Sequence, residues 1–427
     1  MRGSELRGGE PTDEPGTGEL RAQLDSYLTG QEDRLIAFRR DIHMHPELGY
    51  AEHRTTACIA EELTAAGLHP VPLPKGTGLI CEVGCGDGPV VALRADIDAL
   101  PLPDEKDVPY RSTVPGVTHA CGHDVHTTVM LGVARFFAQQ AKAGRLPGRV
   151  RLIFQPAEEN PGGALDVMAA GGIAGVDRIF ALHCDPRVEV GQVGLRVGPI
   201  TAACDKVTVR VTGPGGHTAR PHLTADLVYA LAKIVTELPA AFSRRVDPRS
   251  SLSLVWGRVS AGSVANAIPD EGIAQGTVRC FDDEAWHAAP DLMKALLDSV
   301  ASAYDVKSEL DYVRGVPPTI NEKSTVDLLR QAAKNTLGED SVVPTPQSLA
   351  GEDFAWYLES IPGALARLGV APPGMAGAYD LHRGTFDVDE RCIANGVRFM
   401  AAAALLALGE ARNSPVEPEA VESAATV

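Results

Sequence analysis

The densest group of residues that could do chemistry is the stretch His119-Ala120-Cys121-Gly122-His123-Asp124-Val125-His126. The Cys121 thiolate and the His123 imidazole can both ligate a transition metal such as zinc. Gly122 between them permits a tight backbone turn, so both side chains can face one point. Apolar residues follow at helical spacing over 129–137, which places the stretch on a loop at the start of a helix. For this stretch alone, two interpretations stay open: a metal site, or a turn with hydrogen-bonded histidines and a buried thiol.

Two further histidines, His43 and His45, follow a segment with helical spacing over 20–40 and precede Pro46. One intervening residue and a following proline make a poor chelate. We therefore expect His43 and His45 to be structural, or to line the mouth of a cleft, rather than to bind a metal.

Three short apolar runs, 89–93, 150–154 and 179–182, have the composition of buried parallel strands, with helical patterns between them. This alternation predicts an α/β fold with a mostly parallel sheet flanked by helices. Polar side chains follow the carboxyl end of each run, where open α/β sheets place their ligands. We expect the following residues to meet at one sheet edge, beside Cys121 and His123: Asp98, Glu158, Glu159 and His183. The alternative is that each strand ends in an ordinary polar loop.

A site for two metal ions needs several donor side chains and a bridging group. The sequence offers five such donors: Cys121, His123, Glu159, His183 and His382. A water shared by two ions would become a nucleophile at neutral pH. Of the adjacent pair Glu158 and Glu159, one can ligate while the other takes the proton and passes it to a leaving amine. Asp98 suits the positioning of a ligand histidine. The alternatives are a solvated loop end for the glutamate pair and an ordinary loop histidine for His382.

The pattern of predicted strands and helices changes near residue 200. Strand and helix patterns follow in the order βαββαβ, which predicts an inserted α+β ferredoxin-like domain over 201–315. After Pro317 and Pro318 the pattern of the first domain resumes. We therefore expect a discontinuous catalytic domain, 20–200 and 316–412. Composition predicts that the tails, 1–19 and 413–427, are disordered.

The inserted domain carries a glycine-rich loop over 213–222, where His217 could donate a hydrogen bond to a developing oxyanion. Asn266 and Arg279 are candidates for holding a carboxylate or carbonyl oxygen of a substrate. Taken singly, a turn asparagine and a surface arginine are the simpler explanations of these two residues.

The chain of 427 residues carries a formal net charge of -17. This charge argues against nucleic-acid binding, because phosphate groups need a basic surface. No apolar run approaches the length needed to span a bilayer, and no signal-peptide pattern opens the sequence, so we expect a cytoplasmic protein without a membrane partner. The 8 cysteines are scattered along the chain, which favours free thiols over a disulfide framework.

Together these motifs resemble the aminoacylase/carboxypeptidase-type metallohydrolases. Within them the resemblance is to the N-acyl-amino-acid amidohydrolases, which include hippurate hydrolase and auxin-conjugate hydrolases. It spans about residues 35–408 and is carried by the motifs His43-Met44-His45-Pro46-Glu47, Arg94-Ala95-Asp96-Ile97-Asp98-Ala99-Leu100-Pro101, His119-Ala120-Cys121-Gly122-His123-Asp124, Phe154-Gln155-Pro156-Ala157-Glu158-Glu159, Gly215-Gly216-His217, Glu352-Asp353-Phe354 and Leu381-His382.

The resemblance implies a two-metal catalytic domain with an inserted lid that also forms the contact of a homodimer. It implies as metal ligands Cys121, His123, Glu159, His183 and His382. It further implies that Glu158 is the general base and that Asn266 helps to bind substrate. It also implies that His217 acts at the active site, where the site of the partner subunit is favoured and the site of its own chain stays open. The wider superfamily has a histidine where this chain has Asp96, so ligation must rest on the Cys-Gly-His variant. A thiolate ligand suits zinc, while manganese, cobalt and nickel stay open.

We therefore expect a metal-dependent amidohydrolase that cleaves an N-acyl amino acid, of the hippurate, N-acetyl or aryl-amino-acid kind, into a carboxylate and an amine. Two alternatives stay open. One is a dipeptidase or exopeptidase of the same superfamily, and the other is a non-catalytic, metal-dependent binding protein on this fold. The intact pair Glu158 and Glu159 argues against the second, because binding alone needs no spare base.

Overall fold

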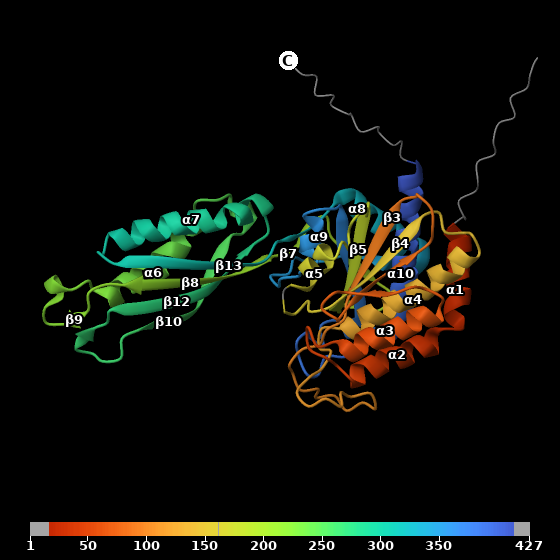
Figure 1. The fold of residues 1–427 in the computed structure, drawn as a ribbon, viewed down its shortest axis with the longest axis horizontal. Coiled ribbons are helices and arrows are strands. Elements are labelled where there is room, and N and C mark those ends of the chain that lie inside the picture. The colour runs from red at the N-terminus through yellow and green to blue at the C-terminus, as the bar shows by residue number, and fades with distance from the viewer. Residues whose placement is uncertain (1–16, 161, 414–427) are drawn as a thin grey trace, which may run out of the picture.

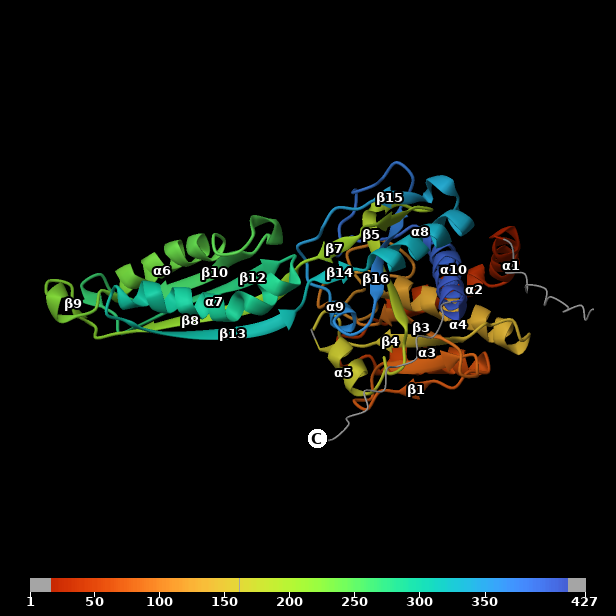
Figure 2. The same ribbon diagram turned by 90° about the horizontal axis from the view of Figure 1, so that it is seen from above.

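Two lobes make up the computed structural model, which describes residues 17–160 and 162–413 (Figure 1). The larger lobe is built around an eight-stranded sheet and the smaller around a four-stranded sheet. The smaller lobe extends to one side of the larger one in both views (Figures 1 and 2). Two neighbouring chain segments connect the lobes, at the paired short strands β7 (Gly198–Thr201) and β14 (Thr319–Asn321).

The larger lobe contains most of the helices and strands. Its helices are α1 (Thr17–Thr29), α2 (Glu32–Met44), α3 (His53–Ala65), α4 (His123–Lys142), α5 (Gly163–Ala169), α8 (Lys323–Leu337), α9 (Ala355–Leu358) and α10 (Arg391–Asn413). Its large sheet consists of β1 (Val71–Pro72), β2 (Leu79–Val83), β3 (Val90–Asp96), β4 (Arg149–Gln155), β5 (Arg178–Glu189), β6 (Val193–Leu195), β15 (Val342–Pro344) and β16 (Gly363–Ala371).

The three apolar runs identified in the sequence form the centre of the large sheet, as predicted. The strand order is β1-β2-β4-β3-β5-β16-β6-β15, and the four strands from β4 to β16 are parallel to one another. The flanking pairs β2 with β4 and β16 with β6 are antiparallel, so the sheet is mixed. Asp96 at the end of β3 lies opposite Gln155 at the end of β4. The loops after these strands therefore leave the sheet at one edge.

Both faces of the large sheet are covered, which explains why its central strands are apolar throughout rather than alternating. Val91, Leu93 and their neighbours pack with α4 and α10 in one core cluster. Val90 and Ala92, on the opposite face of β3, pack with α5 and α9 in another. The burial of both faces fixes the strand ends, and the side chains that follow them, in a rigid frame.

Helix α10 corrects one expectation. Its stretch Arg391–Ala411 is long and apolar enough to cross a bilayer by length and composition, so the statement that no run approaches that length is wrong. The share of its apolar window buried inside the protein is 72%. The helix packs against α4, α8 and strands of the large sheet. Its apolarity is therefore that of a core helix with neighbours on most sides.

The segment 20–40 also differs from its prediction as one helix. The chain turns at Gly30 and Gln31, which separate α1 from α2. Glycine is a weak helix former, and the turn allows α1 to pack on α8 and α10 while α2 packs on α4. Helix α1 begins at Thr17, inside the segment predicted to be disordered; residues 1–16 and 414–427 lie outside the described part of the chain.

The smaller lobe contains β8 (Ala203–Thr212), α6 (Leu227–Phe242), β10 (Ser253–Ala261), β12 (Glu271–Cys280), α7 (Asp283–Ser302) and β13 (Lys307–Val316). Its sheet is antiparallel with the order β10-β12-β8-β13. Buried and less buried residues alternate along β8, because both helices cover the same face of the sheet. A two-stranded ribbon, β9 (Gly216–His217) with β11 (Ala267–Ile268), lies at the end remote from the larger lobe (Figures 1 and 2).

Glu322 caps α8 and gives the fold a measurable acid sensitivity. Its carboxylate accepts hydrogen bonds from the backbone N–H groups of Ser324 and Thr325 at 3.0 and 2.7 Å. Burial acts to raise its pKa, but hydrogen bonds from Thr325 and Ser324 outweigh it and lower the pKa to about 2. The cap should therefore stabilise the fold fully above the unfolded-state pKa of about 4.3 and lose this effect as the pH falls toward 2.

We expect Glu322→Gln to reduce the free energy of unfolding at pH 7 by about 1 kcal/mol, a typical value for loss of a helix cap. The difference from the unmodified protein should shrink as the pH is lowered from 5 to 2. Thermal unfolding across this range measures it, with Glu61→Gln on the exposed side of α3 as control. A difference that grows toward low pH would contradict the prediction.

Candidate metal centre

The structure brings together the five predicted donor side chains, although they lie between residues 121 and 382. Cys121 and His123 flank the start of α4, Glu159 follows β4, and His183 lies within β5. His382 is on a loop after β16, and its backbone N–H donates to Ala120 O at 2.9 Å. The convergence follows from the topology, because β3, β4, β5 and β16 are adjacent and parallel.

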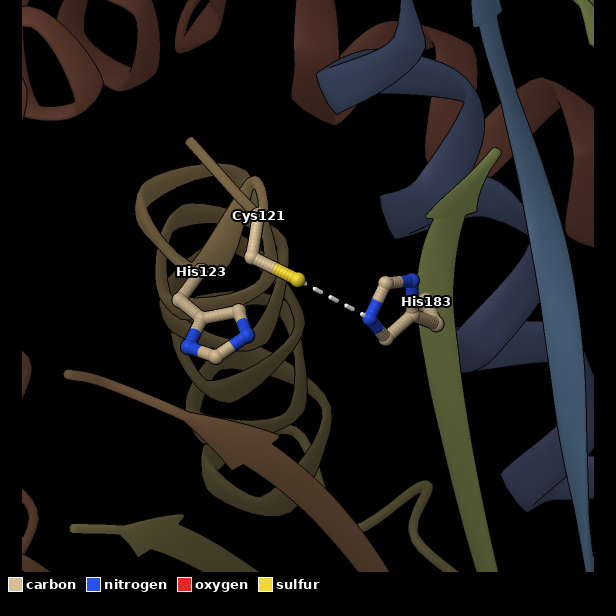
Figure 3. Close-up of side chains that lie close together, drawn as sticks. All are labelled: Cys121, His123 and His183. Carbon is tan, nitrogen blue, oxygen red and sulfur yellow. Dashed lines mark hydrogen bonds between the residues drawn. The ribbon is translucent and has the colours of Figure 1, made fainter. Parts of the chain in front are cut away.

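Cys121, His123 and His183 form the first group of possible metal ligands (Figure 3). Cys121 Sγ lies 3.4 Å from His183 Nε2, and the ligand atoms of all three residues lie within 4.8 Å of one another. Gly122 between the first two has φ +86, and a Cβ there would lie 2.7 Å from Cys184 Sγ. The tight turn expected at Gly122 is therefore required both by its conformation and by the neighbouring strand.

A second group, Cys121, Glu159 and His382, shares the thiol with the first. His382 Nε2 lies 3.2 Å from Glu159 Oε1. The carboxylate of Glu159 raises the pKa of His382 by hydrogen bonding. His382 has φ +58, which is uncommon for a residue with a side chain. Such a conformation persists only where the surroundings enforce it, and functional sites are where it is usually found.

The donor atoms fit a metal ion. His123 Nε2 is buried and has no hydrogen-bond partner in the described part of the chain, whereas its Nδ1 lies 3.1 Å from Asp98 Oδ1. A ring nitrogen left open while a carboxylate holds the other one is the usual arrangement of a metal-binding histidine. Burial, together with Glu159 and Glu158, raises the pKa of the Cys121 thiol. A cation at this point would favour the thiolate instead, and sulfur, nitrogen and carboxylate donors together suit a transition metal.

Asp98 lies between two of the candidate ligands. One carboxylate oxygen faces His123 Nδ1, and the other accepts a hydrogen bond from the backbone N–H of Glu159 at 3.0 Å. Asp98 thereby contacts two candidate ligands, one at the start of α4 and one in the loop after β4. It does not itself belong to either of the two groups that contain Cys121.

Glu158 lines the cavity and makes no hydrogen bond or ion pair with the described residues. Burial first, and then the charges of Glu352 and Glu159, raise its pKa well above the ordinary value. Ala157 just before it has φ +51 and donates its N–H to Glu52 at 2.8 Å. The chain turns away from the direction of β4 at Ala157. The carboxyl group of Glu158 can therefore face the cavity, while Glu159 lies beside the other candidate ligands.

Arg94 is a structural centre that the sequence analysis did not identify. It is buried within β3 and lies 2.7, 3.1 and 2.8 Å from carboxylate oxygens of Asp96, Glu352 and Asp353. Its Nε donates to Gln155 Oε1 at 2.8 Å. An arginine inside an apolar strand is the signal that could have revealed this network, because a buried cation requires partners.

Two other histidines of the motifs, His126 and His43, have partners of their own. His126 Nδ1 lies 2.5 Å from Asp96 Oδ1, and its Nε2 accepts from the backbone N–H of Cys184, so both nitrogens are used. His43 lies in a separate buried network with Asp124 and Asp104, at 2.7 and 3.2 Å. His43 is thus structural, as expected.

The three candidate site residues of the inserted segment, Arg279, His217 and Asn266, lie in two different parts of the smaller lobe. Arg279 on β12 lines a cavity of about 500 Å³ together with Cys121, Glu158 and His183. His217 on β9 lies beside Asn266, whose carbonyl accepts the N–H of Thr218 at 3.3 Å. Both are on the remote ribbon of the smaller lobe, so the structure of one chain does not bring them to the metal centre (Figures 1 and 2).

Known proteins resemble the chain over most of its length. A Bacillus subtilis N-acetyl-L-cysteine deacetylase is 38% identical over 87% of this chain and 88% of its own length. A solved Bacillus subtilis structure, described as a dinuclear metal binding peptidase of the M20 family, is 35% identical and covers 89% of this chain and 99% of its own, with a TM-score of 0.79.

A Rhodococcus jostii protein named after glutamate–cysteine ligase is 48% identical over 87% of this chain, but the chain spans only 46% of that protein. The ligase name therefore describes a protein about twice as long. The sequence model described as Peptidase family M20/M25/M40 matches residues 92–406. The family model and the deacetylase each match most of the chain, and the candidate metal ligands meet at one sheet edge. The chain therefore belongs to peptidase family M20/M25/M40.

Proposed function

We propose that this protein is a two-metal amidohydrolase that cleaves the amide bond of an N-acyl amino acid. The observation that carries the proposal is the convergence of the two possible ligand groups sharing Cys121, with the carboxyl of Glu158, which has no partner in the described ranges, beside them. A binding protein would need the ligands but not this additional acid.

The proposed metal ligands are Cys121, His123, Glu159, His183 and His382. Divalent ions bound there would acidify a water molecule and polarise the amide carbonyl. Zinc suits the thiolate, and manganese, cobalt and nickel are the other ions to be tested. Burial lowers the pKa of His183 well below its ordinary value, so its ring is neutral, the form that ligates.

Glu158 is the proposed general base. It would take a proton from the attacking water and deliver it to the nitrogen of the leaving amino acid, because amide cleavage requires both transfers. Asp98 would hold His123 and the Glu159 backbone in place. Arg279, on the wall of the same cavity, would bind the substrate carboxylate through its planar guanidinium.

The substrate class follows from the chemistry of the site and from one relative. The Bacillus subtilis deacetylase acts, by its name, on an acetylated amino acid, which has one amide and one carboxylate. The second candidate is an exopeptidase, favoured by the peptidase description of the similar solved structure. The two differ in whether the group beside the scissile amide carries a free amine.

Metal-free protein reconstituted with Zn, Mn, Co or Ni should be assayed on N-acetyl and N-benzoyl amino acids and on dipeptides matched to them. We expect hydrolysis of the acyl amino acids and about two bound ions per chain by elemental analysis. Hydrolysis of dipeptides alone would favour the exopeptidase. Metal binding without hydrolysis of any substrate would favour the binding protein.

We further propose that the smaller lobe is a ferredoxin-like lid, 201–315, inserted into a catalytic domain of 20–200 and 316–412. We also propose that the protein is a homodimer whose contact is formed by this lobe. Strand β10 is at the edge of its sheet and exposes Val255 and Val259. An exposed apolar edge strand is prone to pair with another chain. In such a dimer the ribbon with His217 and Asn266 could complete the site of the partner.

Mixing two inactive variants tests this arrangement. Dimers of Glu158→Gln and dimers of His217→Ala should each be inactive, but a hybrid contains one site with an intact Glu158 and a partner with an intact His217. We expect mixtures refolded together to recover up to about a quarter of normal activity, from random pairing with one intact site of two per hybrid. Recovery no greater than the sum of the separate variants would contradict action across the dimer.

We also propose a cytoplasmic enzyme without nucleic-acid or membrane partners. All eight cysteines lie in the described part of the chain and are free, as reducing compartments favour. The net charge of -17 opposes binding to phosphate backbones.

A further inference from the structure

Arg367 on β16 is a buried cation without a partner among the described residues. Its exposed fraction is 6%, and its guanidinium makes no hydrogen bond or ion pair with any residue of 17–160 or 162–413. The other deeply buried arginines, Arg39 and Arg94, each lie 2.7 Å from a carboxylate oxygen. An unpaired buried charge is costly, so a position that retains one needs a physical reason.

The carboxylates that interact electrostatically with Arg367 already have other partners. Asp185 and Glu352 are the carboxylates whose charges favour its cationic form. Asp185 is held by Arg187 through two contacts of 2.9 Å, and Glu352 lies 3.1 Å from Arg94. Neither forms an ion pair with Arg367. The guanidinium therefore keeps its hydrogen-bond donors for a group that is not part of the described chain.

The position of Arg367 places those donors next to the candidate metal centre. In the parallel pairing of β16 with β5, Arg367 lies opposite His183, so both side chains project from the same face of the sheet. Arg367, His183, Cys121 and Glu158 line the same cavity. Arg279 lines it too, but from the smaller lobe. An anion held by Arg367 would thus lie close to the scissile amide and apart from the proposed α-carboxylate site.

We propose that Arg367 is a specificity-determining residue that binds a second carboxylate of the substrate. This inference rests on the proposed amidohydrolase function and narrows it to N-acyl amino acids with two acidic groups. The second carboxylate can be on the amino-acid side chain or at the far end of the acyl group. Both present the same planar anion, which a guanidinium binds through two parallel hydrogen bonds.

Two pairs of substrates distinguish a carboxylate on the amino-acid side chain from one on the acyl group. The first pair is N-acetylglutamate and N-acetylglutamine, which differ only in the charge of the side chain. The second pair is N-succinylleucine and its terminal amide, which differ only in the charge of the acyl group. We expect the metal-loaded protein to prefer the acidic member of one pair by about tenfold to a hundredfold in kcat/KM, the effect of a hydrogen-bonded charge.

The variant Arg367→Met should remove that preference and leave kcat/KM for the amide member unchanged within about threefold. Arg196→Met is the matched control, because Arg196 donates to Pro199 O and does not line the cavity. It should keep the preference. Since Arg367→Met removes an unpaired buried charge, its melting temperature should be equal to or above that of the unmodified protein.

Binding gives a readout independent of turnover. In a metal-loaded Glu158→Gln background, calorimetry should show that Arg367→Met weakens binding of the preferred acidic substrate about tenfold or more and leaves binding of its amide unchanged.

Three results would overturn the inference while leaving the amidohydrolase function intact: equal kcat/KM within both substrate pairs, equal losses for the acidic and amide members in Arg367→Met, or a lowered melting temperature of that variant. Equal losses would mean that Arg367 holds the α-carboxylate, and a lowered melting temperature would mean a structural role. Failure of all N-acyl amino acids in the metal-reconstituted assay would instead reject the proposed function.

Discussion

Glu158→Gln should lower kcat by about 10²–10⁴-fold, the contribution of a general base, while metal content stays unchanged. Glutamine keeps the size of the side chain but cannot accept the proton of the attacking water. Glu158 makes no hydrogen bond or ion pair with described residues, so the substitution breaks no polar contact among them. Single-turnover kinetics, together with elemental analysis of the same sample, measures both quantities.

Glu159→Gln is the control for this experiment. Glu159 belongs to a candidate ligand group with Cys121 and His382, so its substitution should lower the metal content as well as the activity. If Glu158→Gln retained near-normal turnover, the assignment of the base would be wrong. If it lost metal as Glu159→Gln does, Glu158 would be a ligand rather than a free acid.

Arg94→Met should reduce the free energy of unfolding by about 3–5 kcal/mol, the cost of removing one member of a buried ion network. The substitution would leave Asp96, Glu352 and Asp353 buried without the cation that lies within 3.1 Å of each. Burial and Glu352 already raise the pKa of Asp353 to about 7, against the opposing charge of Arg94. Without Arg94 that carboxyl should take up a proton more readily still.

Denaturant unfolding of metal-free protein, followed by circular dichroism, measures this loss without a contribution from metal binding. Arg149→Met is the matched control, because Arg149 begins β4 in the same sheet but pairs with Glu82 at 3.0 Å near the surface. Its substitution should cost about 1 kcal/mol or less. Equal costs for the two variants would show that the Arg94 network does not stabilise the sheet.

Local sequence patterns were enough to predict three of the central strands and that they belong to a mostly parallel sheet. The runs at 89–93, 150–154 and 179–182 became β3, β4 and β5, because uninterrupted apolar stretches of this length fit only a sheet covered on both faces. The parallel pairing then brought Asp98, Glu159 and His183 to one edge. Strands β6 and β15, on the far side of β16, were harder to predict, because they have only three residues each.

Other features depended on packing that no local pattern records. The chain turns at Gly30, although the apolar spacing over 20–40 would have continued the helix, and the turn lets α1 pack on α8 and α10. The apolar composition of α10 fits both a core helix and a membrane-spanning helix. Its packing against α4, α8 and the large sheet identifies it as a core helix. The role of Arg367 also depends on the structure, because only the structure shows that Asp185 and Glu352 have other partners.

The sequence by itself determined which side chains are available for chemistry, and the strand pattern brought most of them to one sheet edge. Only the tertiary structure decided how these side chains are used. It showed that Cys121 belongs to both ligand groups and that both nitrogens of His126 are occupied. It also showed that Glu158 makes no hydrogen bond or ion pair within the described part of the chain. The physical reason is that burial and hydrogen bonding act between residues distant in sequence, and they decide which polar atoms are satisfied inside the protein and which face the cavity.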